Sequence, residues 1–314
     1  MLKVGSAAVN AEQGDAENSG VDEPGEPGAP AAEGGTAESG KPARSAGRDL
    51  PAAIGVGLAL GAAVLAALLT YRQLFLIVIA AAVAVGTIEL AGAFRRGADI
   101  RIARVPLLLG GQAMVWLTWP FGLRGALVGF VATVLACLLW RMRSGADGYL
   151  RDVAASVFAA AYVPLFASFA ALLVLPLDGV GRVLTFLIVV VCSDTGGYAA
   201  GVLLGRHPMA PSISPKKSWE GFAGSLVSGL VAGWLAIWLL LDGQWWQGAI
   251  LGVAVVCSAT LGDLMESLVK RDLGIKDMGT LLPGHGGLMD RLDSLLPSAV
   301  LSWMMLGLML PTGG

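Results

Sequence analysis

Charged side chains are scarce in this sequence. Only 14% of its 314 residues are Asp, Glu, Lys or Arg, whereas soluble proteins have about 25%. Because so little charge cannot cover a water-facing surface of this size, and 55% of the residues are hydrophobic, we expect most of the apolar surface to face lipid. The net charge is only −2, so the chain has no basic field for nucleic acid.

Cysteine and histidine are also rare. The three cysteines, Cys137, Cys192 and Cys257, each lie in an apolar run and form no CxxC pair or Cys/His cluster. Small buried hydrophobic residues are the simplest interpretation. His207 and His285 are too few and too far apart for a histidine-rich metal site. The sequence also has no GxxxxGK[ST] motif, which excludes a Walker A loop.

The first 48 residues differ in composition from everything that follows. They are rich in Gly, Ala, Glu and Pro and contain almost no large apolar side chain. Such a segment cannot bury enough apolar surface to offset its ordering entropy. We therefore expect residues 1–48 to be a disordered acidic tail.

From Pro51 onward the chain is a series of apolar runs. About 20 apolar residues are needed to cross a bilayer as a helix. The runs predict an all-α, polytopic membrane bundle of about nine transmembrane helices, divided into an N-terminal region at 49–180 and a C-terminal region at 181–314, which contains most of the polar clusters. The expected spans are 51–70, 74–94, 103–121, 124–140, 152–175, 182–204, 219–241, 246–266 and 294–311.

The distribution of basic residues predicts an orientation. With nine spans and a cytoplasmic N-terminus, 17 of the 21 Lys and Arg lie in cytoplasmic segments near span ends. Only Arg72, Arg124 and Arg182 lie outside, and Lys3 is in the far tail. The positive-inside rule favours this arrangement. It predicts a multi-pass protein of the cell (cytoplasmic) membrane.

Two polar clusters lie within and directly after the sixth expected span. The first is Ser193–Tyr198, which puts Asp194 inside an expected span, where an acidic residue is costly and by default functional. The second is the proline-containing loop 205–221, in which Lys216 and Lys217 stand where the next span begins. A structural acid and a pair of topology anchors are the alternative interpretations.

The longest polar stretch runs from Asp263 to Ser294. The spacing of Asp263, Glu266, Ser267 and Lys270 puts them on one face of a helix. Carboxylate oxygens suit Mg²⁺, and lysine and arginine side chains suit phosphate oxygens. The stretch therefore indicates a site for a polyphosphate at the membrane surface.

At this point the sequence resembles a known family. The segment 267–293, which we call the signature segment, matches the phosphatidate cytidylyltransferase signature without departure: Ser267–Arg271, then Lys276 and Asp277, then Leu282–Asp293. Ser193–Tyr198 and Ile213–Gly221 are also similar to family motifs. One difference is Ser218, where many members have Thr, and it keeps the hydroxyl group.

The resemblance implies a reaction and its partners. Members of the family join CTP and phosphatidic acid to give CDP-diacylglycerol and pyrophosphate, in the bilayer, with Mg²⁺ and as homodimers. We therefore expect a nucleotidyltransferase of phospholipid biosynthesis, with its active site at the cytoplasmic ends of the last four transmembrane helices.

The expected roles of the side chains follow from their chemistry within this resemblance. The residues expected to be catalytic, mainly by holding phosphates, are Lys216, Lys217, Lys270, Arg271, Asp290 and Arg291. The residues expected to bind substrate are Ser214, Ser267, Lys276 and His285. The expected metal ligands are Asp263 and Asp290, with Asp194 and Asp293 as further ligands or supporting groups.

Other functions fit parts of the same pattern. An acid within the membrane also suits a polytopic transporter, although the charged groups gather near one membrane face. A kinase or a cytidylyltransferase acting on another membrane lipid would need similar phosphate-binding groups. Dependence of product formation on CTP separates the transporter from the enzymes.

The expected orientation is testable with a topology reporter. A reporter fused after Gly314 should behave as an extracytoplasmic domain, because nine spans from a cytoplasmic N-terminus end outside. A reporter at this position that is active only in the cytoplasm would contradict the orientation.

Overall fold

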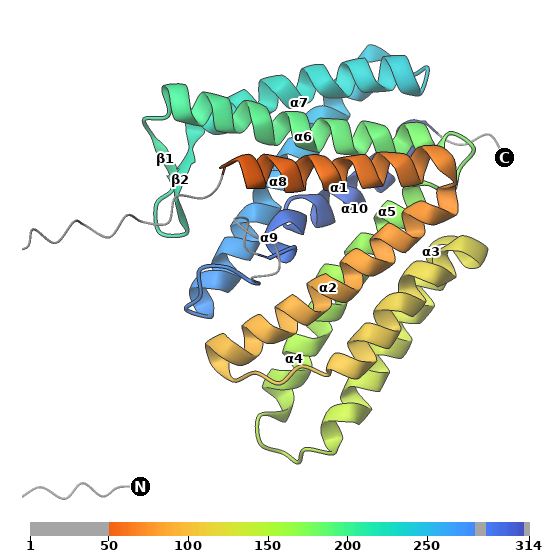
Figure 1. Ribbon diagram of the computed structural model, residues 1–314, viewed down its shortest axis with the longest axis vertical. Coiled ribbons are helices and arrows are strands. Elements are labelled where there is room, and N and C mark those ends of the chain that lie inside the picture. The colour runs from red at the N-terminus through yellow and green to blue at the C-terminus, as the bar shows by residue number, and fades with distance from the viewer. Residues whose placement is uncertain (1–49, 280–286, 311–314) are drawn as a thin grey trace, which may run out of the picture. The chain divides into compact units, whose positions relative to one another are not determined.

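Helices dominate the structure, a computed structural model that describes residues 50–279 and 287–310 (Figure 1). The predicted tail at 1–48 lies outside the described residues, as does His285. The elements are α1 (Leu50–Thr70), α2 (Arg72–Ala98), α3 (Arg104–Met142), α4 (Tyr149–Ala160), the π-helix η1 (Ala161–Leu165), α5 (Phe166–Leu173), α6 (Gly179–Leu204), β1 (Pro208–Ala210), β2 (Ser214–Ser218), α7 (Trp219–Leu240), α8 (Trp245–Asp272), α9 (Met289–Leu292) and α10 (Leu295–Met309).

The all-α polytopic class is confirmed. Helices satisfy their own backbone groups, which is why long apolar runs become helical in lipid. Within the described residues, seven helices are long and apolar enough to cross a membrane by length and composition. The expected count of nine is not confirmed: α3 is a single 39-residue element among the seven, and α1 is not one of them.

The 39-residue α3 folds back on itself. Gly122 has φ 56° and ψ −141°, a conformation open to glycine, and it follows Pro120. The two arms then pack closely: a Cβ added to Gly110 would lie 1.9 Å from the Thr133 hydroxyl, and one on Gly129 would lie 3.2 Å from the Cα of Met114. The runs expected at 103–121 and 124–140 correspond to these two antiparallel arms (Figure 1).

One end of the helical bundle gathers the connections that contain few basic residues. The Arg72 guanidinium at the start of α2 donates hydrogen bonds to the carbonyls of Pro176 and Leu177, between α5 and α6. Arg182 in the first turn of α6 donates to the carbonyl of Leu310, after α10. The α1–α2 and α5–α6 connections and the end of α10 therefore lie together.

The base-rich connections meet at the other end. The backbone N–H of Arg101, between α2 and α3, donates to Asp152 of α4. Arg96 of α2 donates to the carbonyl of Met278, beyond α8, and Arg271 of α8 contacts a carbonyl of the β1–β2 hairpin. This clustering fits the alternation of spans on which the sequence-based orientation depends.

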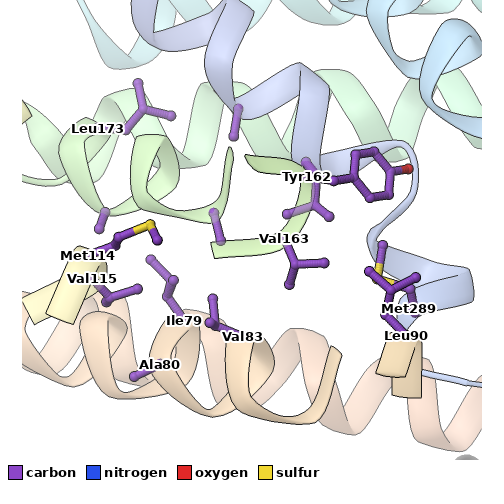
Figure 2. Close-up of a cluster of buried hydrophobic side chains, with 14 of the residues drawn as sticks. Ile79, Ala80, Val83, Leu90, Met114, Val115, Tyr162, Val163, Leu173 and Met289 are labelled. Carbon is purple, nitrogen blue, oxygen red and sulfur yellow. The ribbon is translucent and has the colours of Figure 1, made fainter. Parts of the chain in front are cut away.

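The hydrophobic core joins α2 to the C-terminal region. Figure 2 shows side chains of α2 facing those of α3, α5 and η1, among them Val83, Met114 and Val163. Met289 of α9 is fully buried beside Leu90 in the same cluster. The signature segment is thus anchored in a core that residues far upstream in the sequence provide.

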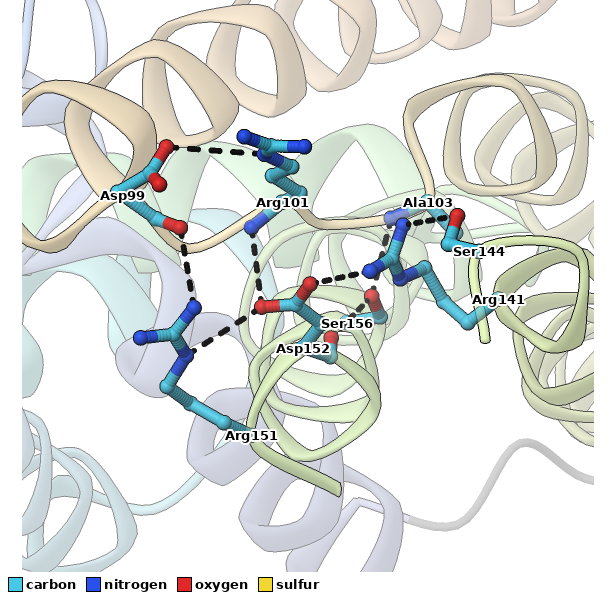
Figure 3. A network of polar contacts seen from close by, with 8 residues as sticks. All are labelled: Asp99, Arg101, Ala103, Arg141, Ser144, Arg151, Asp152 and Ser156. Atoms are coloured by element: carbon cyan, nitrogen blue, oxygen red, sulfur yellow. Dashed lines mark hydrogen bonds and ion pairs between the residues drawn. The ribbon is translucent and has the colours of Figure 1, made fainter. Parts of the chain in front are cut away.

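A buried ion pair holds α3 to α4 at the base-rich end (Figure 3). Arg141 and Asp152 form this pair, and their side chains are only 9% and 3% exposed. Asp152 also accepts a hydrogen bond from the backbone N–H of Arg101. In the same network Arg101 and Asp99 form a second pair at 3.6 Å, but both side chains are largely exposed.

We expect Asp152→Asn to destabilise the protein by roughly 3 kcal/mol, because it leaves Arg141 buried without its charged partner. Asp99→Asn is the matched control. It breaks an exposed pair, expected to contribute under about 1 kcal/mol, and Asn tolerates the left-handed backbone at this position. Unfolding of the detergent-solubilised variants measures both changes. Equal losses in the two variants would contradict the role given to the buried pair.

Candidate active site

A polar cavity of about 640 Å³ lies among α6, β2, α7, α8 and the α9–α10 region. Five carboxylates and four cations line it, an unusual density of charge for helices of this hydropathy. These residues are Asp194, Asp263, Glu266, Asp290 and Asp293, together with Lys216, Lys217, Lys270 and Arg291.

Small residues bring α6 against α7 beside the cavity. A Cβ added to Gly196 or Gly197 would lie 2.1 Å from the hydroxyl of Ser228 or Ser225, respectively. The Ser225 hydroxyl donates to the carbonyl of Ser193 at 2.9 Å. The two glycines thus permit close helix packing without breaking α6, and Asp194 on the same helix lines the cavity.

The proline-containing loop forms the antiparallel β1–β2 hairpin, which is tied to the start of α7. Ser218 caps α7 by accepting a hydrogen bond from the N–H of Gly221 at 3.1 Å. Glu220 accepts from the N–H groups of Arg206 and His207, and its carboxylate lies 2.6 Å from the His207 ring. These contacts hold the hairpin against the N-terminus of α7, which directly follows β2.

Lys217 crosses from the hairpin to α8. Its Nζ lies 2.5 Å from Oδ2 of Asp263, and both side chains are partly exposed to the cavity. Lys216 also lines the cavity and is more exposed. The pairing holds the Lys217 charge in place beside the Asp263 carboxylate, at the wall of the cavity.

Lys270 lies between two carboxylates. Its Nζ is 2.6 Å from Oε2 of Glu266, one turn earlier on α8, and 2.6 Å from Oδ1 of Asp290 on α9. Glu266 is 1% exposed. Because a buried charge is unfavourable without a partner, these contacts fix the position of the lysine.

Asp290 also binds the backbone of the signature segment. Its carboxylate accepts hydrogen bonds from the N–H of Gly287 at 2.8 Å and from the N–H of Met278 at 3.1 and 3.2 Å. Both oxygens therefore have donors, from the backbone and from Lys270. These contacts make the carboxylate an organising group of the segment.

The structure brings most of the expected site residues together. Those that line the cavity are Asp194, Lys216, Lys217, Asp263, Ser267, Lys270, Asp290, Arg291 and Asp293. Ser214, Arg271 and Lys276 are not among its lining residues. Arg271 contacts the carbonyl of Ile213, so it supports the hairpin, and Lys276 is exposed.

Two acidic residues were not among the expected site residues although the sequence contained a signal for each. Glu266 lies on the same helical face as Asp263 and Lys270, and the structure makes it the buried partner of that lysine. Glu89 stands out as the main ionisable residue of the early spans. It accepts a hydrogen bond from the N–H of Met289, 200 residues away in sequence.

The oxygen donors of the cavity suit a hard divalent cation. Asp194, Asp263 and Asp293 line the same cavity. Among the described residues, no three His, Cys, Asp or Glu side chains form a group placed to hold an ion by themselves. Mg²⁺ commonly takes one or two protein carboxylates and completes its shell with phosphate and water, so the donor set fits it, and the four-carboxylate metal site remains a prediction.

Fold and cavity together define a multi-pass helical membrane protein with a charged site at the base-rich ends of its C-terminal helices. The sequence model of the Cytidylyltransferase family matches residues 51–309. The chain belongs to this family of nucleotidyltransferases.

Named relatives agree with the match. The phosphatidate cytidylyltransferase of Mycobacterium leprae is 53% identical over 288 residues, which cover 87% of this chain and 92% of the relative. That of Mycobacterium bovis is 53% identical over 277 residues, covering 84% and 90%. The Haemophilus influenzae phosphatidate cytidylyltransferase is 42% identical over 125 residues, covering 38% of this chain and 43% of the relative.

We expect Asp290→Asn to lower turnover on the order of a thousandfold, about 4 kcal/mol of barrier. An amide group cannot accept from all of the backbone donors, and it leaves the Lys270–Glu266 pair without its second carboxylate. Asp272→Asn, at the exposed end of α8, is the matched control and should keep normal turnover. The measurement is the steady-state rate of cytidylyl transfer by each purified variant. Near-normal turnover of Asp290→Asn would contradict the prediction.

Proposed function

We propose that this chain transfers the cytidylyl group of CTP to phosphatidic acid, forming CDP-diacylglycerol and releasing pyrophosphate. The observation that supports this most directly is the charged cavity at the ends of membrane helices, where a lipid headgroup and a nucleotide are both within reach. The mycobacterial relatives at 53% identity are phosphatidate cytidylyltransferases, which points to the same substrate.

The main requirement of the reaction is the stabilisation of negative charge, and proton transfer is less important. A phosphate monoester is largely ionised near pH 7, so an oxygen of the phosphatidate phosphate can attack the α-phosphorus of CTP without a strong base. A P–O bond forms there, and the bond from the α-phosphorus to the pyrophosphate oxygen breaks. The barrier lies mainly in bringing two anions together and stabilising the leaving group.

The side chains of the cavity divide into two chemical sets. Lys216, Lys217, Lys270 and Arg291 are our candidates for holding the phosphates of CTP and lipid. The candidates for holding Mg²⁺ are Asp263, Asp194 and Asp293, which line the cavity. Asp290, the other expected ligand, already accepts from Lys270 and from two backbone N–H groups, so we assign it to orienting Lys270 and the signature segment. A bound Mg²⁺ would neutralise phosphate charge and stabilise the departing pyrophosphate.

The charge balance supports the need for a cation. Five carboxylates and four cations line the cavity, so the protein alone presents no excess of positive charge to two anionic substrates. A divalent ion bound by the carboxylates changes that balance. The same acidic groups that would repel CTP in the absence of metal then contribute to its binding.

We place the site on the cytoplasmic side of the cell membrane. The base-rich connections meet at the end of the bundle that also carries Lys216, Lys217 and the signature segment, and basic connections are retained in the cytoplasm. A homodimer is a further expectation that rests on the family resemblance.

The test is incorporation of label from CTP into lipid by the purified protein. With phosphatidic acid and Mg²⁺, label at the α-phosphate should enter the lipid, and label at the γ-phosphate should appear in pyrophosphate. Omitting Mg²⁺ or phosphatidic acid should abolish both. Entry of γ-label into lipid would indicate a kinase, and preference for an isoprenoid phosphate would indicate another cytidylyltransferase. Absence of product with every lipid would contradict the proposal.

Asp263→Asn should reduce this incorporation on the order of a thousandfold at ordinary Mg²⁺ concentrations, because the substitution removes a charge expected to hold the metal. The amide would also pair less well with Lys217. Asp272→Asn on the same helix, with an exposed side chain, should leave it unchanged. Near-normal incorporation by Asp263→Asn would remove this residue from the metal site.

A further inference from the structure

Two stretches of backbone in the signature segment lie in direct contact, and we call this contact the neck. The neck consists of Met278 and Gly279 on one side and Gly287, Leu288 and Met289 on the other. A Cβ added to Gly287 would lie 2.7 Å from the nitrogen of Gly279, so the two backbones touch. Asp290 binds the neck on its cavity side through the N–H groups of Met278 and Gly287.

Glu89 of α2 also contacts both sides of the neck. Its Oε2 accepts a hydrogen bond from the N–H of Met289 at 2.8 Å. A Cβ added to Gly279 would lie 2.3 Å from Oε1, and one on Gly287 would lie 2.6 Å from Oε2. The carboxylate therefore occupies the space that a side chain would take at either glycine.

A second residue of α2 contacts the neck two helical turns further on. Arg96 donates a hydrogen bond to the carbonyl of Met278 at 2.8 Å. Gly97 packs against the segment that follows α8, since a Cβ there would lie 2.4 Å from the carbonyl oxygen of Leu273. The base-rich end of α2 is thus fitted closely to the signature segment.

The burial of Glu89 needs an explanation beyond packing. The residue is only 9% exposed and lies within a helix long and apolar enough to cross the membrane. An acidic residue in such a helix is costly and is retained for a specific interaction. Its described hydrogen-bond partner is the backbone immediately before Asp290.

We propose that Glu89 is a positioning residue for catalysis: it fixes the neck so that Asp290 and Arg291 face the cavity and Lys270 keeps its place. Glu89 does not line the cavity, so it acts through the backbone of the signature segment and not on substrate. This inference rests on the proposed cytidylyltransferase activity.

The first test compares variants at two positions of α2. Glu89→Ala should lower kcat at least twentyfold while changing KM for CTP less than threefold. Glu89→Gln keeps an oxygen that can accept from Met289 and should recover most of the loss. Thr87→Val, a nearly isosteric change at a buried position of the same helix, controls for packing and should stay within twofold of wild type.

The second test uses the close approach of Gly279 to the Glu89 carboxylate. Gly279→Ala should lower kcat at least tenfold in the wild-type background, because the new methyl group displaces either the carboxylate or the neck. In the Glu89→Ala background the space is open, and the same change should cost less than threefold. Such coupling is expected of groups in contact and not of independent damage.

Each result has a distinct meaning. A wild-type protein that forms no product from CTP and phosphatidic acid would refute the proposed function. An active wild type whose kcat survives Glu89→Ala, or whose Gly279→Ala loss is equal in both backgrounds, would overturn the positioning role alone. If Glu89→Ala does not stay monodisperse in detergent, the wild-type background serves alone: a Gly279→Ala variant with unchanged kcat would also overturn the role, because its methyl group would have to displace the Glu89 carboxylate or the neck.

Discussion

The contacts of Lys270 with Glu266 and Asp290 connect the parts of the site. They join α8 to α9 through one ammonium group. Because Glu266 is almost wholly buried, displacement of the lysine would leave a carboxylate without its partner in a low-dielectric environment. That penalty gives the lysine one strongly preferred position. Asp290, which contacts the lysine, also accepts hydrogen bonds from the backbone of the signature segment and so fixes that backbone relative to α8.

The N-terminal helices complete this arrangement from the opposite side. Met289 is buried among side chains of α2, η1 and the other core elements (Figure 2), and Glu89 binds its N–H group. Arg96 binds the carbonyl of Met278. The early spans, whose sequences contain few polar residues, therefore determine where the polar residues of the signature segment stand.

The charges also explain why such a site lies at the end of a membrane bundle. Carboxylates and cations are costly in lipid unless they pair or reach water. Lys217 pairs with Asp263, and Lys270 pairs with two acids, so the protein keeps its charges compensated before substrates bind. Small residues on α6 and α7 bring the two helices close enough to form one wall of the cavity.

The sequence alone determined the helical class, the family and most of the cavity residues. Hydrophobicity along one chain is enough to find apolar runs, and helical periodicity placed Asp263 and Lys270 on one face. Only the tertiary structure decided that Arg271 and Lys276 do not line the cavity and that Glu89 meets Met289. The physical reason is that periodicity fixes directions within one helix, whereas contacts between residues 200 positions apart depend on how complete helices pack.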